Sequence, residues 1–207
     1  MTEPSRTPDS REPVYGLDIE TDTALGGLDP SVAPIVAIAV CGEGWSRVFD
    51  GDESDILVEV DRAIAALEPG VIVTWNGARF DLPFISDRAR MTNTSLGLDL
   101  TADLRSRSMH EPLPGHQGGY LATWHGHSHL DAYRVYRADV GASLGIPCGL
   151  KPLARLVGLD PIEVDRESIH DLSSEELNAY VASDAILTRA LALRRWPTAR
   201  RAIDPSG

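Results

Sequence analysis

The chain has 207 residues, of which 43% are hydrophobic and 24% charged, a composition typical of one globular domain with a substantial core. No apolar run approaches the ~20 residues that a membrane-spanning helix needs, so we expect no membrane partner. The formal net charge of −12 argues against strong non-specific binding to nucleic acid, because such binding depends on neutralising phosphates.

The two ends of the chain differ from its middle in composition. Residues 1–13, MTEPSRTPDSREP, are polar and contain three prolines, which indicates a disordered leader. Cys41 and Cys148 belong to no CxxC motif, which favours two buried, reduced thiols in a cytoplasmic protein. With no repeat and no long linker, we expect one domain over residues 14–196 and a flexible tail over residues 197–207.

The first third of the chain alternates strand patterns with one helix pattern. Residues 14–20 (VYGLDIE) and 35–42 (IVAIAVCG) have the composition of strands, and residues 45–51 are predicted to return as a hairpin partner. From residue 57, apolar side chains spaced three and four residues apart predict a helix that ends at Pro69–Gly70. The β-branched run VIVTW that follows predicts a central strand.

The middle of the chain contains the least regular pattern. A helix is expected over residues 82–91, after the break at Asn76–Gly77. Residues 98–133 combine an alternating segment, a Pro/Gly-rich loop and a possible return strand, and we interpret them as an inserted β-hairpin.

The last third is predicted to be helical. Residues 133–144 and 151–157 have helical patterns, and Ser173 and Glu176 have the spacing of a capping box at the start of a final helix. That helix is expected to stop before Pro197. The whole order of elements predicts a mixed α/β layer fold.

Two acids lie close together on the first predicted strand. Asp18 and Glu20 are two residues apart, so their side chains leave the same face of the strand. Their repulsion and desolvation are unfavourable unless a cation compensates, and carboxylate oxygens suit Mg²⁺ or Mn²⁺. The alternative is a strand end whose acids point to water.

A third acid, Asp81, follows the strand VIVTW near the start of a helix. The loop after a strand is where ligands gather in open α/β sheets, which makes Asp81 a candidate site residue. The alternative is an ordinary N-cap, because Asp is a favoured cap and Pro83 fits the first helical turn. Phe80 beside it is either part of the core or a surface for stacking a base.

Tyr180 and Asp184 are four residues apart in the final helix and therefore share a face. A functional interpretation has Asp184 completing a carboxylate cluster while the Tyr180 hydroxyl orients a water molecule. The alternative is a tyrosine at the edge of the core and an aspartate at the surface.

Taken in order, these motifs resemble the DEDD exonuclease superfamily in its tyrosine variant, and within it the proofreading domain of family B DNA polymerases. The similar segments are GLDIET with Asp18 and Glu20, WNGARFDLPF with Asp81, and YVASD with Tyr180 and Asp184. SHLDAYRVYR and GLKPLARLVGL between the motifs also look alike, so the resemblance covers about residues 14–195. It implies a ribonuclease-H-like fold, a five-stranded mixed sheet flanked by helices.

The resemblance also implies roles for the acids. Asp18 would bridge two metal ions, and Glu20 and Asp184 would hold the ion that activates water. Asp81 would bind the second ion through water, and Tyr180 would position the nucleophile. Two divalent ions about 4 Å apart can stabilise both the attacking and the leaving oxygen of a phosphoryl displacement.

Substrate contacts are expected from the second motif. The resemblance assigns Asn76 and Phe80 to the terminal nucleotides, and Arg79 beside them is a further candidate for the substrate strand. Lys151 could contact phosphate, or lie on a solvated helix face together with nearby arginines. Asp131 is either an outer residue of the metal site or a simple strand-end acid.

The leading hypothesis is a 3′→5′ exonuclease that uses two Mg²⁺ or Mn²⁺ ions to hydrolyse 3′-terminal phosphodiester bonds of single-stranded or frayed DNA and releases nucleoside 5′-monophosphates. An exoribonuclease acting on RNA is the first alternative, because one or two contacts decide whether a site tolerates a 2′-hydroxyl. A catalytically silent module that binds nucleic acid or a polymerase is the second. The excess of acids predicts weak binding alone, and hence a polymerase or other protein that delivers the 3′ end.

Five of the six histidines lie between His110 and His129. His125, His127 and His129 alternate, so on a strand they would share a face and could hold zinc. No cysteine is nearby, and Gly126 and Ser128 weaken the strand, so we favour histidines that are solvated or contact nucleic acid.

Overall fold

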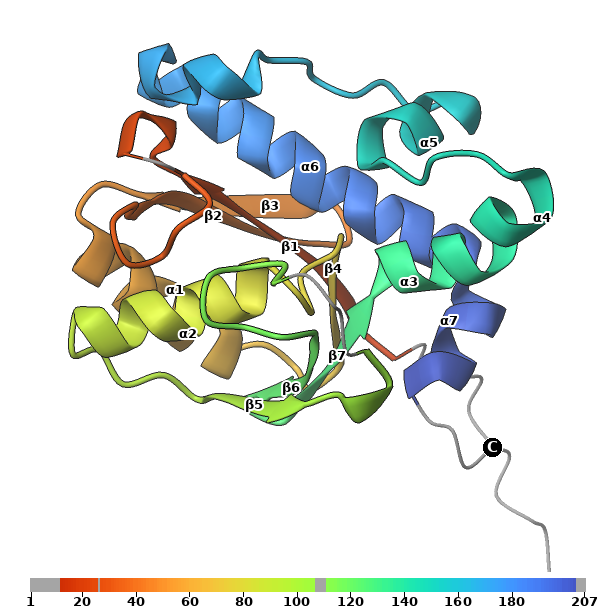
Figure 1. Ribbon diagram of the computed structural model, residues 1–207, viewed down its shortest axis with the longest axis horizontal. Helices are drawn as coiled ribbons and strands as arrows, with labels where there is room; N and C mark the ends of the chain where they lie inside the picture. The colour runs from red at the N-terminus through yellow and green to blue at the C-terminus, as the bar shows by residue number, and fades with distance from the viewer. Residues whose placement is uncertain (1–11, 26, 107–110, 204–207) are drawn as a thin grey trace, which may run out of the picture.

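The computed structural model describes residues 12–25, 27–106 and 111–203. A mixed sheet of seven strands passes through these residues in the order β3-β2-β1-β4-β7-β6-β5. Helix α6 lies over one face of the sheet, and α1 and α2 lie on the other side (Figure 1). The mixed α/β class is as predicted, but the sheet has seven strands rather than five.

The strands are short, and the central ones are parallel. β1 pairs antiparallel with β2 and parallel with β4, and β4 pairs parallel with β7. Their bounds are β1 Val14–Thr21, β2 Ile35–Gly42, β3 Trp45–Asp50, β4 Val71–Thr74, β5 Leu98–Ala102, β6 Tyr120–Trp124 and β7 His127–Asp131.

The predicted hairpin insertion over residues 98–133 contains the expected antiparallel pair, formed by β5 and β6. Its expected return strand is two strands, β6 and β7, joined by a tight turn at His125 and Gly126, whose φ angles are 47° and 83°. Positive φ at both positions is what a two-residue hairpin turn requires. Because β7 then pairs with β4, the segment extends the main sheet, which accounts for the additional strands.

Most helices match the predicted segments. The capping box at Ser173 and Glu176 is present in full. The helices are α1 Glu53–Ala65, α2 Asp81–Met91, α3 Ala132–Tyr136, α4 Ala142–Leu144, α5 Leu150–Leu156, α6 Ser174–Arg194 and α7 Trp196–Ile203. Short turns of other helix types are η1 Thr23–Leu25, η2 Leu104–Ser106, η3 Arg137–Gly141 and η4 Arg166–Asp171.

The expected flexible tail from residue 197 is instead helical as far as residue 203. Pro197 lies in the first turn of α7, where a proline is tolerated because its missing N–H would have no intrahelical partner. Ala199 is fully buried against the cluster that contains Val71 and Leu130. This part of the predicted tail therefore belongs to the folded domain.

The two faces of the sheet carry side chains of different size. On β2, Ile38 and Val40 join the large cluster beneath α1 and α2. The alternate positions Ala37, Ala39 and Cys41 are small and lie beneath α6. Small side chains let the backbone of α6 come close to the sheet, which brings polar groups on that helix near β1.

Cys41 and Cys148 are buried free thiols, as predicted. No helix within the described part of the chain is long and apolar enough to cross a bilayer.

Candidate active site

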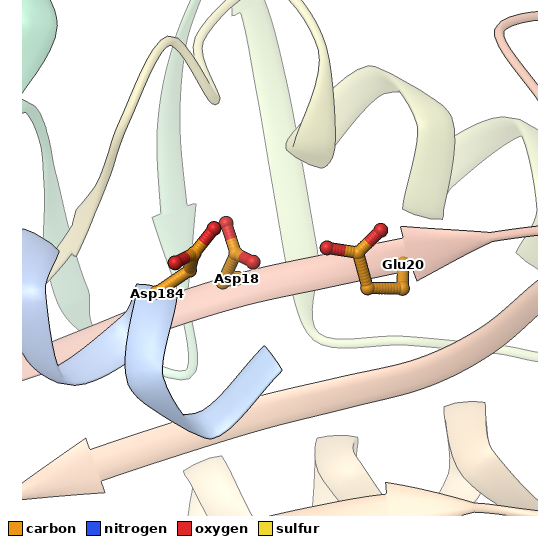
Figure 2. A group of neighbouring side chains, drawn as sticks. All are labelled: Asp18, Glu20 and Asp184. Carbon is orange, nitrogen blue, oxygen red and sulfur yellow. The ribbon is translucent and has the colours of Figure 1, made fainter. Parts of the chain in front are cut away.

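Three carboxylates from two distant parts of the chain converge above the centre of the sheet. Asp18 and Glu20 extend from one face of β1, and Asp184 reaches toward them from α6 (Figure 2). Each contributes an oxygen atom, and these oxygens lie within 4.8 Å of one another. Asp18 and Glu20 thus gather with Asp184, although both are half-buried rather than fully buried.

A close contact between backbones fixes α6 above β1. A Cβ atom built at Gly16 would lie 2.2 Å from the carbonyl oxygen of Ala185, which no side chain could tolerate. Glycine at this position therefore lets the helix settle directly on the strand. Since Ala185 follows Asp184, this contact determines how far the Asp184 carboxylate extends toward Asp18.

Asp81 lies beside this trio and is not an N-cap. It is the first residue of α2, and the N-cap position belongs to Phe80, which makes no side-chain cap bond. The Asp81 side chain is only 4% exposed. A hydrogen bond from the Ile19 amide favours its charged form, which places its carboxylate against β1.

The electrostatics connect all four acids. Burial raises the pKa of Asp18 well above its ordinary value, and the charges of Asp81, Glu20 and Asp184 raise it further. Burial also raises the pKa of Asp81 to about 7. Carboxylates that resist ionisation in this way are stabilised as anions when a cation is close.

Tyr180 and Asp184 are both buried, at 1% and 4% exposure. The alternative of a surface aspartate is therefore wrong. Lys151 of α5, the only lysine of the chain, reaches into the same place. Its Nζ lies 3.6 Å from Asp184 Oδ2 and 3.8 Å from the centre of the Tyr180 ring.

The chemistry of the donors fits a hard divalent cation. Carboxylate oxygens supply all three converging ligand atoms, as Mg²⁺ and Mn²⁺ prefer. One lysine provides a single positive charge among four acids, which leaves an excess that bound cations would neutralise. The cluster could thus hold a metal ion.

Comparisons with known proteins show the family to which the chain is related. A family model described as the exonuclease domain of DNA polymerase family B matches residues 47–143. That range contains Asp81 but neither Asp18 nor Asp184, so the assignment of those two acids depends on the geometry above. The chain belongs to the proofreading exonuclease superfamily.

The relatives are much longer proteins. The chain is 32% identical over 157 residues to a DNA polymerase epsilon catalytic subunit from Schizosaccharomyces pombe, covering 73% of this chain and 6% of that protein. The corresponding polymerase epsilon protein of Saccharomyces cerevisiae is 30% identical over 156 residues, with the same shares. A family B DNA polymerase from Pyrobaculum calidifontis matches in structure with a TM-score of 0.73 and 20% identity, over 93% of this chain and 26% of that one. This confirms the ribonuclease-H-like fold.

The predicted substrate contacts lie on one turn between β4 and α2, next to Asp81. Asn76 adopts a left-handed conformation with φ of 68°. Phe80 is half-buried, with its ring centre 5.4 Å from that of Phe84. Arg79 donates hydrogen bonds to Ser106, at 3.1 Å to the carbonyl oxygen, so its guanidinium already has a partner within the chain. All three stay predictions as substrate contacts.

The alternating histidines serve the sheet rather than a shared metal. His127 is 1% exposed and bonds the backbone of Gly70 and Ile64, so the expectation of a solvated side chain is wrong there. His129 lies 2.8 Å from the Thr74 hydroxyl, and His125 lies 3.0 Å from Asp61. Among the described residues, only the acidic trio brings three ligand atoms together; His110 lies outside them.

Two site residues were weakly signalled in the sequence. Lys151 appeared as one of several surface cations, yet it is 6% exposed and lies within the acid cluster. Its being the sole lysine, inside an apolar helix, was the available signal. Asp131 is likewise buried. The pKa of Asp81 is raised mainly by the burial of Asp81, and the charge of Asp131 raises it further.

Proposed function

We propose that this domain is a metal-dependent 3′→5′ exonuclease that hydrolyses 3′-terminal phosphodiester bonds of single-stranded or frayed DNA and releases nucleoside 5′-monophosphates. The observation that carries the proposal is the convergence of Asp18, Glu20 and Asp184, with Asp81 beside them. Membership of the proofreading exonuclease superfamily supports the same chemistry.

The four acids would hold the divalent ions. When bound, a pair of such ions supplies stabilisation of both the attacking and the leaving oxygen of an in-line displacement. The protein contributes a rigid base for these ligands, because Asp18 and Glu20 lie on a central strand and Asp184 on a helix packed against it. Rigid elements hold a site in position better than loops do.

Tyr180 would orient the attacking water through its hydroxyl. Its ring is buried beneath the Lys151 ammonium, which limits the directions in which the side chain can point. Lys151 also lies beside Asp184 and favours the charged form of the Asp18 carboxylate. We therefore assign two roles to Lys151. It keeps the Asp18 and Asp184 carboxylates charged, and it limits the orientation of the Tyr180 ring.

The turn over residues 76–80 would receive the 3′ end of the substrate. Asn76 would bond the terminal nucleotide, the exposed part of the Phe80 ring would stack on a base, and Arg79 would approach the phosphates. Arg79 can do so only if the guanidinium shares its donors with Ser106. The folded domain begins with β1 at residue 14, and with α7 included we place its end near residue 203.

We favour DNA over RNA because the relatives are named as DNA polymerases. The chain's net charge of −12 makes independent capture of a nucleic acid weak, which favours delivery by a polymerase or a similar protein. A catalytically silent binding module is disfavoured, because such a module gains nothing from four mutually repelling acids of which Asp81 and Asp184 are buried.

Digestion of labelled DNA and RNA oligonucleotides of matched sequence tests the proposal. With Mg²⁺ or Mn²⁺ we expect nucleoside monophosphates to be released one at a time from the 3′ end of DNA, and EDTA to stop the reaction. A 3′ phosphorothioate linkage and an oligonucleotide labelled at the 5′ end establish direction. Faster digestion of RNA would support the exoribonuclease alternative, and no digestion of either would support the silent module.

A further inference from the structure

We infer that Asp131 is a positioning residue that fixes the turn over residues 76–80, and through it the nucleotide contacts proposed above. The inference rests on the proposed function. Asp131 is the last residue of β7 and lies opposite Thr74, the last residue of β4, in a parallel pair. Its side chain therefore lies where the turn leaves the sheet.

One buried carboxylate oxygen of Asp131 connects two elements. Asp131 Oδ1 accepts hydrogen bonds from the Asn76 amide at 2.9 Å and from the Tyr133 amide at 3.1 Å. The second bond caps the N-terminus of α3. The first holds the residue with which the turn begins. The side chain is 6% exposed, so water does not compete strongly for either bond.

The turn needs such a restraint because its conformation is unusual. Asn76 has a φ of 68°, a region that asparagine tolerates but seldom prefers. At Gly77 an added Cβ would lie 2.3 Å from the Thr74 hydroxyl oxygen, so the backbone folds tightly back onto the strand. Backbone of this kind persists only when its surroundings determine it. The Asp131 bond acts on the amide of the left-handed residue itself.

The far side of the turn has anchors of its own besides Asp131, although the Ala78 amide also lies against the Asp131 carboxylate. The Tyr120 amide donates to the Ala78 carbonyl at 2.8 Å, and Arg79 donates to Ser106. Removing the Asp131 carboxylate would thus release the beginning of the turn while its later part stays anchored. The expected result is a displaced Asn76 and a reoriented Phe80 rather than an unfolded loop.

Asp52 provides a matched control. It is the N-cap of α1, and its carboxylate accepts a hydrogen bond from the Ser54 amide at 3.0 Å, as Asp131 does from Tyr133. It is absent from the acid cluster and the turn. Asp52→Ala therefore removes a helix cap alone, whereas Asp131→Ala removes a cap and the restraint on Asn76.

Steady-state hydrolysis of a single-stranded DNA oligonucleotide with Mg²⁺, far below the melting temperatures of all variants, tests the inference. For Asp131→Ala we expect KM to rise by about tenfold to a hundredfold, because small displacements of positioning groups have effects of that size. Asp131→Asn should restore KM to within about threefold, since the amide oxygen of asparagine can accept from the Asn76 and Tyr133 amides as Oδ1 does. Asp52→Ala should lower the melting temperature and leave KM and kcat unchanged.

Asp131→Ser covers the case in which the alanine variant does not fold. Serine caps a helix about as well as aspartate does but is shorter, so it should keep α3 and lose the Asn76 bond. We expect a near-wild-type melting temperature with a raised KM. Wild-type KM and kcat in both Asp131→Ala and Asp131→Ser would overturn the inference.

Amide hydrogen exchange separates this inference from the proposed function. In Asp131→Ser the Asn76 amide should exchange faster, while the Tyr120 amide stays protected by its bond to Ala78. This readout needs no catalysis. If the wild-type protein hydrolyses no nucleic acid, the proposed function fails, whereas unchanged exchange at Asn76 would remove the positioning role alone.

Discussion

Two regions of this molecule that hold acidic side chains of low exposure differ in how the charges are balanced. Glu53 at the start of α1 is matched by Arg88 of α2 in a two-point contact, with Arg88 Nη2 2.6 Å from Oε2 and Nε 2.8 Å from Oε1. Both side chains are 11% exposed. Above β1, by contrast, Asp18 is surrounded by three more acids and the single cation of Lys151.

The difference shows which region serves stability. A one-to-one pair with matched geometry is satisfied by the chain itself, and it connects two helices on the same face of the sheet. The charges of four acids around one lysine are not balanced by the chain. When no metal ion is bound, their repulsion therefore lowers the stability of this region. Buried, unbalanced charge of one sign is what the structure would keep for binding cations.

The largest effect is expected from removing the central acid. Asp18→Ala should lower the rate of hydrolysis on the order of a thousandfold, comparable with the loss of a preorganised electrostatic group at an active site. The fold should stay intact, and the melting temperature in EDTA should rise by about 2–4 °C for each kcal/mol of repulsion removed. Full activity of this variant with Mg²⁺ would contradict the assignment.

The opposite pattern is expected at the balanced pair. Arg88→Ala should lower the free energy of unfolding by about 3–5 kcal/mol, because it leaves the Glu53 carboxylate buried without its partner. Urea denaturation measures this loss. The kcat of the folded protein should be unchanged, so a large loss of activity at low temperature would mean that the two regions are not independent.

Tyr180→Phe should reduce kcat by about tenfold, since metal binding would survive and only the orientation of water would suffer. The increase in melting temperature produced by Mg²⁺ should be the same as in the wild-type protein. Tyr136→Phe is a matched control: it removes a buried hydroxyl that donates to the Leu191 carbonyl at 3.1 Å, away from the acids. That variant should lose about 1 kcal/mol of stability and no activity.

The smallest effect is a pH dependence of stability in EDTA. The folded-state pKa values of Asp18 and Asp81 lie above the usual value near 3.9, that of Asp81 at about 7. The folded state therefore binds more protons than the unfolded state near neutrality, so stability should rise by about 1 kcal/mol as the pH falls from 8 to 6.5.

The pH range of this effect is limited, and Mg²⁺ provides a control for it. Below pH 6.5 the trend should weaken, because burial lowers the pKa of His129 to about 3, and its unfolded form takes up protons first. Saturating Mg²⁺ should remove the rise, since bound cations keep the carboxylates charged at both pH values. A rise of equal size in Asp18→Asn would show that Asp18 does not contribute to it.

The sequence by itself determined the features that depend on near neighbours. Asp18 and Glu20 share a face because strands alternate, and Tyr180 and Asp184 share one because helices repeat every 3.6 residues. The capping box at Ser173 followed from the same local rules, as did the helix predicted from residue 57 to Pro69–Gly70, which the structure has as Glu53–Ala65. The order of the motifs was sufficient to suggest the superfamily.

Only the tertiary structure decided which distant segments meet. The pairing of β7 with β4 made seven strands out of an expected five, buried His127, and brought the Asp131 carboxylate to the Asn76 amide. The contact between Gly16 and Ala185 set α6 close to β1. Pairing between strands and packing of helices join residues far apart in the chain, and periodicity within one segment carries no information about its partner.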